Sequence, residues 1–239
     1  AASDVYKRQT QDILPRMGWK KLPDTTNYTL LLTSGAYAES LLGRLRVPGG
    51  RFRSRLAHTI SFPAWHRRSK EPVADSVLSE HLPGDPLPLV EPSSDYALAC
   101  ISSEWEPGWL DSAPQDMGRF FWLVGHSGGR PVGLTISRLF RRHGSWQASL
   151  LHVQACERSS ELYEWLITES SRFLARRGAT KVLCRASCEV YSAALKRTGF
   201  VERSRTPAFW WSKDRTIPIG PIHLTQWRAD ELIRPYPTS

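Results

Sequence analysis

The chain has 239 residues, of which 41% are hydrophobic, and it includes ten tryptophans. This composition excludes a disordered chain and supplies enough apolar side chains for one or two domains with a sizeable core. The net charge is +9, but the Lys and Arg residues are scattered along the chain instead of forming one stripe. We therefore expect no specific nucleic-acid binding.

The four cysteines do not form a paired CxxC arrangement, which favours reduced thiols in a cytoplasmic protein. Cys184 and Cys188 with His152 make an incomplete ligand set, so we expect no metal site. No run of eighteen apolar residues occurs, and no charged start leads into an apolar signal core. These features predict a protein without a membrane-spanning segment.

The beginning of the chain contains two unusual features. Residues 4–9 (DVYKRQ) match the translation of an adapter used in sequencing libraries, and we exclude them from reasoning about the fold. Residues 16–32 can be laid on residues 197–213 without a gap, so that Gly18 coincides with Gly199 and Trp19 with Phe200. We expect the first thirty residues to be the closing helix end and strand pair of an earlier unit, with the preceding part of that unit missing.

The next segment is rich in proline and basic residues. Ser34–Arg46 has the apolar spacing of a short helix, which Pro48–Ser54 ends. The chain up to Pro92 is predicted to be a linker, with one helix around Ala74–Leu82. Two roles stay open for it, a functional lid and an interdomain strap.

A domain is predicted to begin at Pro86. Pro86–Val90 is predicted to be a strand, Ser93–Trp105 a helix and Gly108–Met117 a second, broken helix. Arg119–Ser127 and Arg130–Arg142 are predicted to form a hairpin, because the GHSGGR sequence between them is the clearest turn signal in the chain.

A strand, helix, strand unit follows the hairpin. Ser149–Ala155 has the branched apolar composition of a buried strand, and a helix is predicted to begin near Ser159 or Ser160. Thr180–Ala186 is the next predicted strand. This spacing indicates parallel strands with a right-handed crossover.

The end of the chain is predicted to add a helix and further strands. The helix is Cys188–Thr198, closed by Gly199, and two final strands are expected at Phe200–Arg203 and Pro207–Lys213. Residues 222–225 (IHLT) are a candidate edge strand, next to prolines that limit its pairing.

From Arg119 onward, the order of elements resembles the GNAT superfamily of acyl-CoA-dependent N-acyltransferases. The helix ending in KRTGF, with its Gly-Phe corner, is similar to the helix-to-strand signature of that family. The resemblance implies an α/β (α+β) fold with a mixed central sheet flanked by helices over residues 86–239. In this interpretation residues 1–33 contain the C-terminal remnant of a first GNAT-like domain, and residues 34–85 are a linker. The second domain would pack on the missing N-terminal GNAT-like domain.

The resemblance also implies a reaction. An acetyl group would pass from acetyl-CoA to an amine of a small molecule or protein by direct attack within a ternary complex. The family holds the CoA pyrophosphate on a glycine-rich loop at a helix start. The corresponding loop here, Glu157–Ser160, has no glycine and opens with an acid. The implied cofactor contacts are the backbone of His152, Val153 and Gln154, and the helix start at Arg158, Ser159 and Ser160; alternatively, the last three residues only cap the helix.

Two residues are candidates for a catalytic role. The family often has a tyrosine four residues before the glycine of the Gly-Phe corner, where this chain has Leu195. Tyr191, one turn earlier, is a candidate general acid or a packed tyrosine, and His152 is a candidate base or an ordinary strand histidine. The competing hypothesis is a catalytically silent GNAT-like domain that serves as the binding or packing partner of a lost active half.

Overall fold

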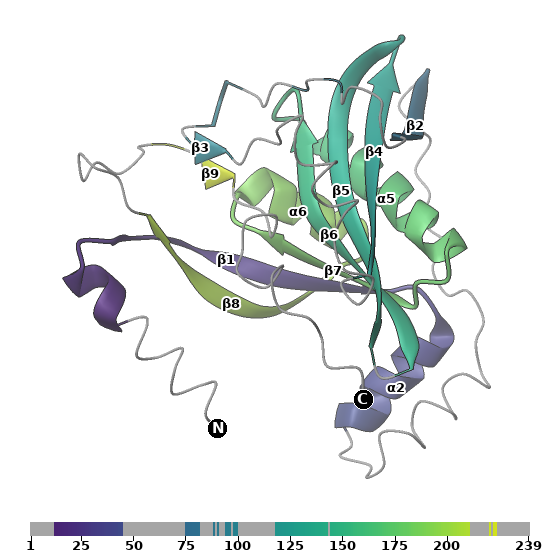
Figure 1. Ribbon diagram of the computed structural model, residues 1–239, viewed down its shortest axis with the longest axis horizontal. Coiled ribbons are helices and arrows are strands. Elements are labelled where there is room, and N and C mark those ends of the chain that lie inside the picture. Colours follow the sequence, from purple (N-terminus) through teal and green to yellow (C-terminus); the bar gives the residue numbers. More distant parts are fainter. Residues whose placement is uncertain are drawn as a thin grey trace.

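The computed structural model describes residues 12–44, 75–81, 88, 90, 94–96, 98–99, 118–142, 144–210, 220 and 222–223. They form an α+β structure with a mixed seven-stranded sheet and helices packed against it (Figure 1). The sheet order is β2-β4-β5-β6-β7-β1-β8. Its strands are β1 (Lys20–Leu31), β2 (Ser76–His81), β4 (Arg119–Ser127), β5 (Arg130–Arg142), β6 (Ser145–Ala155), β7 (Lys181–Ala186) and β8 (Val201–Trp210).

The β4/β5 hairpin confirms the strongest turn signal of the sequence. Ser127 pairs with Arg130, and the two residues between them, Gly128 and Gly129, have φ of 55° and 77°. A two-residue turn with both φ values positive matches the twist of antiparallel strands, and glycine adopts these angles without a steric penalty. The sequence therefore determines this turn locally.

Helix α5 (Ser160–Arg176) connects β6 to β7, which run parallel as predicted. It begins at the expected residue because Ser159 is its N-cap and accepts a hydrogen bond from the Leu162 backbone N–H. Helix α6 (Glu189–Arg197) follows β7 with Cys188 as its N-cap. Helix α2 (Ser34–Arg44) confirms the short helix predicted at Ser34–Arg46. Ahead of it, the single strand β1 stands where a strand pair was predicted.

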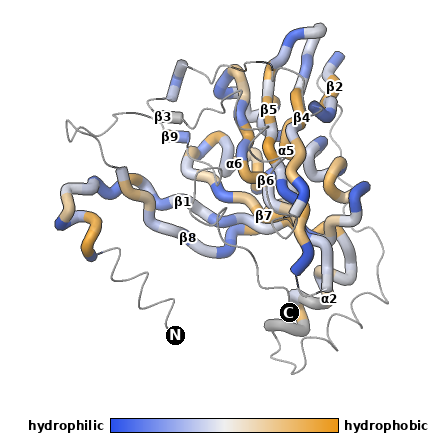
Figure 2. The backbone as a smooth tube through the Cα atoms, viewed as in Figure 1, coloured by the Kyte–Doolittle hydropathy of each residue, from blue (hydrophilic) through white to orange (hydrophobic). Residues whose placement is uncertain are grey.

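Helices α5 and α6 cover one face of the sheet. On β5, Thr135 hydrogen-bonds to Ser170 of α5, whereas the neighbouring Leu134 and Ile136 belong to a separate apolar cluster with Val90. Since successive strand residues point to opposite faces, the sheet has a core on each side. Hydrophobic residues accordingly concentrate along β4, β5, β6 and α5 (Figure 2).

Several predicted elements differ from the structure. Residues 76–81, predicted as part of a helix, form strand β2 on the edge of the sheet beside β4. The two predicted final strands are one continuous strand, β8, because it stays paired with β1 along its length.

The stretch predicted as the first strand and helix of the domain also differs. Pro88 and Val90 are not in a strand, while within the predicted helix Ser94 and Asp95 form a turn and Leu98–Ala99 form β3. Strand β3 pairs in parallel with β9 (Ile222–His223), the observed part of the expected edge strand. The predicted helix at Gly108–Met117 lies outside the described residues.

Candidate functional site

The candidate site lies where β6 and β7 separate. The two strands pair only between Gln147–Leu150 and Lys181–Cys184, although β6 continues to Ala155. Beyond Leu150 the edge of β6 therefore faces a gap in the sheet instead of β7. In the resemblance described above, this edge would contact CoA through the backbone of residues 152–154.

Side chains of this chain fill the gap. His223 is only 1% exposed. Its Nε2 lies 2.7 Å from the Val153 carbonyl oxygen, and its Nδ1 lies 3.5 Å from Cys188 Sγ. The Val153 carbonyl accepts, so Nε2 carries the proton and Nδ1 accepts from the thiol. The ring centroid of His223 lies 5.1 Å from that of Tyr96, 5.7 Å from Tyr163 and 5.4 Å from Tyr191. Three tyrosine rings thus pack around the imidazole of His223.

The groups in this cluster are held neutral. Burial, with the nearby His152, lowers the pKa of His223 to about 4, although the hydrogen bond that His223 donates to the Val153 carbonyl acts in the opposite direction. Burial raises the pKa of Cys188, and it raises the pKa of Tyr163 and Tyr191 well above the ordinary value for tyrosine. A thiolate nucleophile needs a lowered thiol pKa, so the Cys188–His223 contact is not an activated nucleophile pair.

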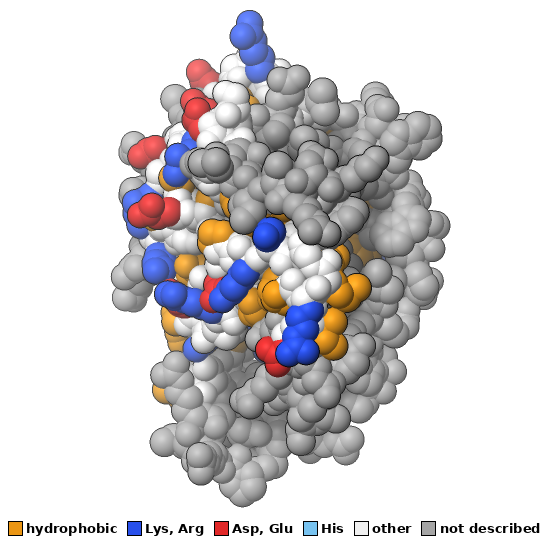
Figure 3. Space-filling view, turned by 90° about the vertical axis from the view of Figure 1, so that its left-hand side faces the viewer, with side chains coloured by type: hydrophobic (Ala, Val, Ile, Leu, Met, Phe, Trp, Pro, Cys, Tyr) orange, Lys and Arg blue, Asp and Glu red, His pale blue; other side chains and the backbone are white. Residues whose placement is uncertain are grey.

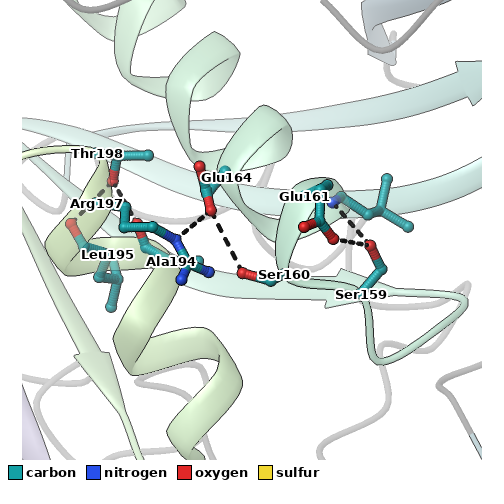
Figure 4. Close-up of polar contacts among 9 residues, drawn as sticks. Ser159, Ser160, Glu161, Glu164, Ala194, Leu195, Arg197 and Thr198 are labelled. Carbon is teal, nitrogen blue, oxygen red and sulfur yellow. Dashed lines mark hydrogen bonds and ion pairs between the residues drawn. The ribbon is translucent and has the colours of Figure 1, made fainter. Parts of the chain in front are cut away.

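The start of α5 holds the serines predicted to bind the cofactor. Ser159 Oγ accepts from Leu162 N at 3.2 Å and donates to Glu161 Oε2 at 3.1 Å. Ser160 Oγ donates to Glu164 Oε1 at 3.3 Å, and the same carboxylate pairs with Arg197 of α6 (Figure 4). Both serines are therefore engaged in contacts within α5, and Glu164 links α5 to α6.

Arg158 precedes these serines and differs from them. Its guanidinium carbon lies 5.9 Å from the ring centroid of Tyr96, and its Nε is buried without a hydrogen-bond partner among the described residues. A positively charged group beside the first turn of a helix is the part of this loop best suited to an anion.

The two candidate catalytic residues are fully buried. His152 Nε2 lies 2.9 Å from Gln154 Oε1, and the Gln154 amide donates to the Val90 carbonyl. The Tyr191 hydroxyl lies 2.8 Å from Cys184 Sγ, a thiol whose pKa burial raises to about 12. Each side chain contacts neighbouring core residues, so neither is positioned to meet a substrate.

The sequence interpretation did not identify the Cys188–His223–Val153 contacts. His223 follows Cys188 by 35 residues and Val153 by 70, and no periodicity relates them. The only local signal was that Cys188 is the first residue of a predicted helix. The predicted site residues His152, Val153 and Gln154 do lie together with Tyr191 and the start of α5 around one gap.

The residues present do not fit CoA in this arrangement. A pantetheine chain alongside β6 would need the strand edge that His223 contacts, and a pyrophosphate at the start of α5 would meet the acidic Glu157 and a loop without glycine. No group of three or more potential metal ligands occurs among the described residues. No helix in the described part of the chain is both long and apolar enough to span a membrane.

Similarity to known proteins is found among solved structures. No family model matches the chain, and no curated protein matches it. A solved structure of a GCN5-related N-acetyltransferase from Anabaena variabilis ATCC 29413 is similar, with a TM-score of 0.49 and 10% sequence identity. The match covers 83% of this chain and 42% of the other, so this chain spans less than half of that protein.

Proposed function

We propose that the described domain is a GNAT-like domain that acts as a binding or packing partner and does not itself transfer acyl groups. The observation that carries this proposal is the contact of His223 with the Val153 carbonyl, which occupies the strand edge required by the cofactor. The partner in this proposal is a second GNAT-like unit that carries the acyltransferase activity.

The burial of the candidate catalytic groups supports the same proposal. A general base or acid must come within hydrogen-bond reach of the reacting atoms. His152 and Tyr191 are instead satisfied by Gln154 and Cys184 inside the core. Bringing either group to a substrate requires breaking a buried hydrogen bond and displacing its neighbours.

A second candidate function is N-acetyl transfer from acetyl-CoA to an amine by this domain. Two features favour it: the separation of β6 from β7, and the Nε of Arg158 at the start of α5, which has no hydrogen-bond partner within the described part of the chain. In this alternative the β9 segment leaves the gap before the cofactor enters. Arg158 would then contact the pyrophosphate with the Ser159 and Ser160 backbone.

Calorimetry with acetyl-CoA and the full chain distinguishes the two functions. The matched variants are Arg158→Glu and Arg203→Glu, of which the second makes the same charge change at an exposed position of β8. We expect no binding at millimolar acetyl-CoA by any of the three folded proteins. Saturable binding that Arg158→Glu abolishes and Arg203→Glu preserves would overturn the partner role and would support acyl transfer.

A further inference from the structure

The repeat seen in the sequence extends to individual backbone hydrogen bonds. Residues 12–16 are helical and end in a left-handed Gly18 with φ 87°, as α6 ends in Gly199 with φ 94°. Three bonds at the first helix end have counterparts at the second, each 181 residues later. They are Met17 N to Ile13 O, Gly18 N to Pro15 O and Trp19 N to Leu14 O, matched by Thr198 N to Ala194 O, Gly199 N to Lys196 O and Phe200 N to Leu195 O. Residues 12–31 therefore repeat the structure of residues 193–212 where both are described.

The two copies pair with each other in a symmetric register. Thr25 lies opposite Thr206, its own counterpart. At the two ends of the ladder, exchanging each residue for its counterpart converts one observed pair into another: Lys20–Trp210 becomes Thr29–Val201, and Lys21–Phe209 becomes Tyr28–Glu202. Between them the register shifts at Leu22/Thr25 and Asn27/Tyr28, and there the pairs do not interchange. The ladder thus has an approximate two-fold axis near Thr25 and Thr206, the arrangement that two equivalent units adopt in an isologous contact.

The two helix ends differ in what covers them. Ile13 and Met17 are 50% and 64% exposed, whereas their counterparts Ala194 and Thr198 are 0% and 9% exposed. In α6 these positions are buried by the rest of the domain. Figure 2 shows hydrophobic residues in the short helix at the margin of the molecule, and Figure 3, which faces that side, shows hydrophobic side chains gathered beside Lys and Arg. The first helix end lacks, among the described residues, the cover that its counterpart has.

The strand edges differ in the same way. Strand β1 pairs with β8 on one side and with β7 on the other, where Tyr28 lies opposite Cys184. Strand β8 is the last strand of the sheet within the described residues. Applying the two-fold relation to the β1–β7 pairing places an equivalent of β7 on the outer edge of β8, with the counterpart of Cys184 opposite Phe209. Pro207 lacks a backbone N–H, and it corresponds to Thr26, which is at the end of the β1/β7 ladder. A missing N–H at the end of a ladder removes the fewest hydrogen bonds between the strands.

We infer that residues 12–17 and the outer edge of β8 form a docking surface for a second unit of the same fold. That unit adds its equivalent of β7 antiparallel to β8 and covers Ile13 and Met17, so that one sheet runs through both units with β1 and β8 at its centre. The inference rests on the partner role proposed above and specifies the geometry of that partnership. Exposed apolar side chains on a helix, beside a strand edge that no described strand pairs with, suit this mode of strand addition.

A duplicated chain tests the inference. A second copy of residues 76–191 is placed directly ahead of Gln11, the counterpart of Ser192, so that residues 11–31 complete the added unit. Hydrogen exchange is measured at Ala208–Trp210 in the duplicated chain and in the original chain. We expect exchange at the outward-facing amides to slow about tenfold or more in the duplicated chain. The matched control is the duplicated chain with Ile13→Lys and Met17→Lys, in which this protection is lost.

Two results would overturn the inference. The first is that the duplicated chain folds, as shown by a helical signal twice that of the original chain, but the amides of Ala208–Trp210 still exchange at the rate seen in the original chain. The second applies if the duplicated chain does not fold. A labelled peptide of residues 179–187, which contains β7, is then added to the original chain. Failure of this peptide to slow exchange at Ala208–Trp210 would overturn the docking surface. Acetyl-CoA binding by the original chain would instead contradict the partner role and leave the β8 result unchanged, so the two failures are distinguishable.

Discussion

Gly125 and Gly133 lie directly opposite each other on β4 and β5, and both face α5 at close range. A Cβ atom added at Gly125 would lie 2.6 Å from Trp165, and one at Gly133 would lie 2.5 Å from Leu166. These glycines allow the helix to approach the hairpin. Because α5 leads from β6 toward β7, its position on the hairpin also fixes where its N-terminus meets the gap.

Gly133→Ala is expected to lower the free energy of unfolding by about 1–3 kcal/mol, because overpacking displaces Leu166. Chemical denaturation measures this change. Gly144→Ala, at a position with open space but φ of 79°, is the control for backbone strain without a clash. In a Leu166→Ala background Gly133→Ala should cost clearly less. Equal costs in both backgrounds would show that the close contact is not the cause.

Local signals predicted the elements that surround these glycines. The two-glycine turn specified the β4/β5 hairpin, and Ser159 specified the start of α5, since each signal acts within a few residues. Strand β2 was mistaken for helix because Ser76–His81 is short and has no strong period. Its pairing with β4, 45 residues away, decides its structure.

The site was only partly predictable. The sequence located the strand and helix start correctly, but the gap is filled by His223, whose partners are distant in the chain. The repeat at residues 16–32 was visible, yet its place in the sheet was not. Alignment identifies equivalent segments, whereas the pairing of β1 between β7 and β8 depends on tertiary contacts. The adapter origin of residues 4–9 and the domain boundaries stay predictions.

Ser159→Ala is expected to destabilise the protein by about 1 kcal/mol, because it removes the N-cap acceptor for Leu162 N–H. Ser160→Ala removes a side-chain contact with Glu164 on the helix surface and should cost less than half as much. Thermal denaturation of both variants measures the difference. If Ser159→Ala leaves stability unchanged, the capping interpretation of this loop is wrong.

Tyr191→Phe tests whether this hydroxyl has a structural role. It removes the 2.8 Å contact with Cys184 Sγ and leaves a buried thiol without that partner, which should cost about 1 kcal/mol of unfolding free energy. In the double variant Tyr191→Phe, Cys184→Ala the two effects should not add, because they share one interaction. Strict additivity in this cycle would mean that the hydroxyl and the thiol act independently.

Acid should destabilise the protein through His223. Its pKa is about 4 in the folded protein and about 6.5 when unfolded, so only the unfolded state binds a proton between these values. Stability present above pH 6.5 is therefore lost as the pH falls toward 4, by at most about 1.4 kcal/mol per pH unit, and the loss levels off below 4. Tyr96, Tyr163, Tyr191 and Cys188, which surround the ring, have raised pKa values and stay neutral over this range.

His223→Gln removes this titration while leaving a hydrogen-bonding side chain at the same place. The variant should be less stable than the original protein at pH 7.5, and the difference should shrink as the pH falls to 4, because only the original protein pays for excluding a proton. Denaturation at several pH values between 4 and 7.5 measures both curves. His152, which also faces His223, is present in both proteins, so its contribution largely cancels. Parallel curves would show that His223 is not held neutral by burial in the gap between β6 and β7.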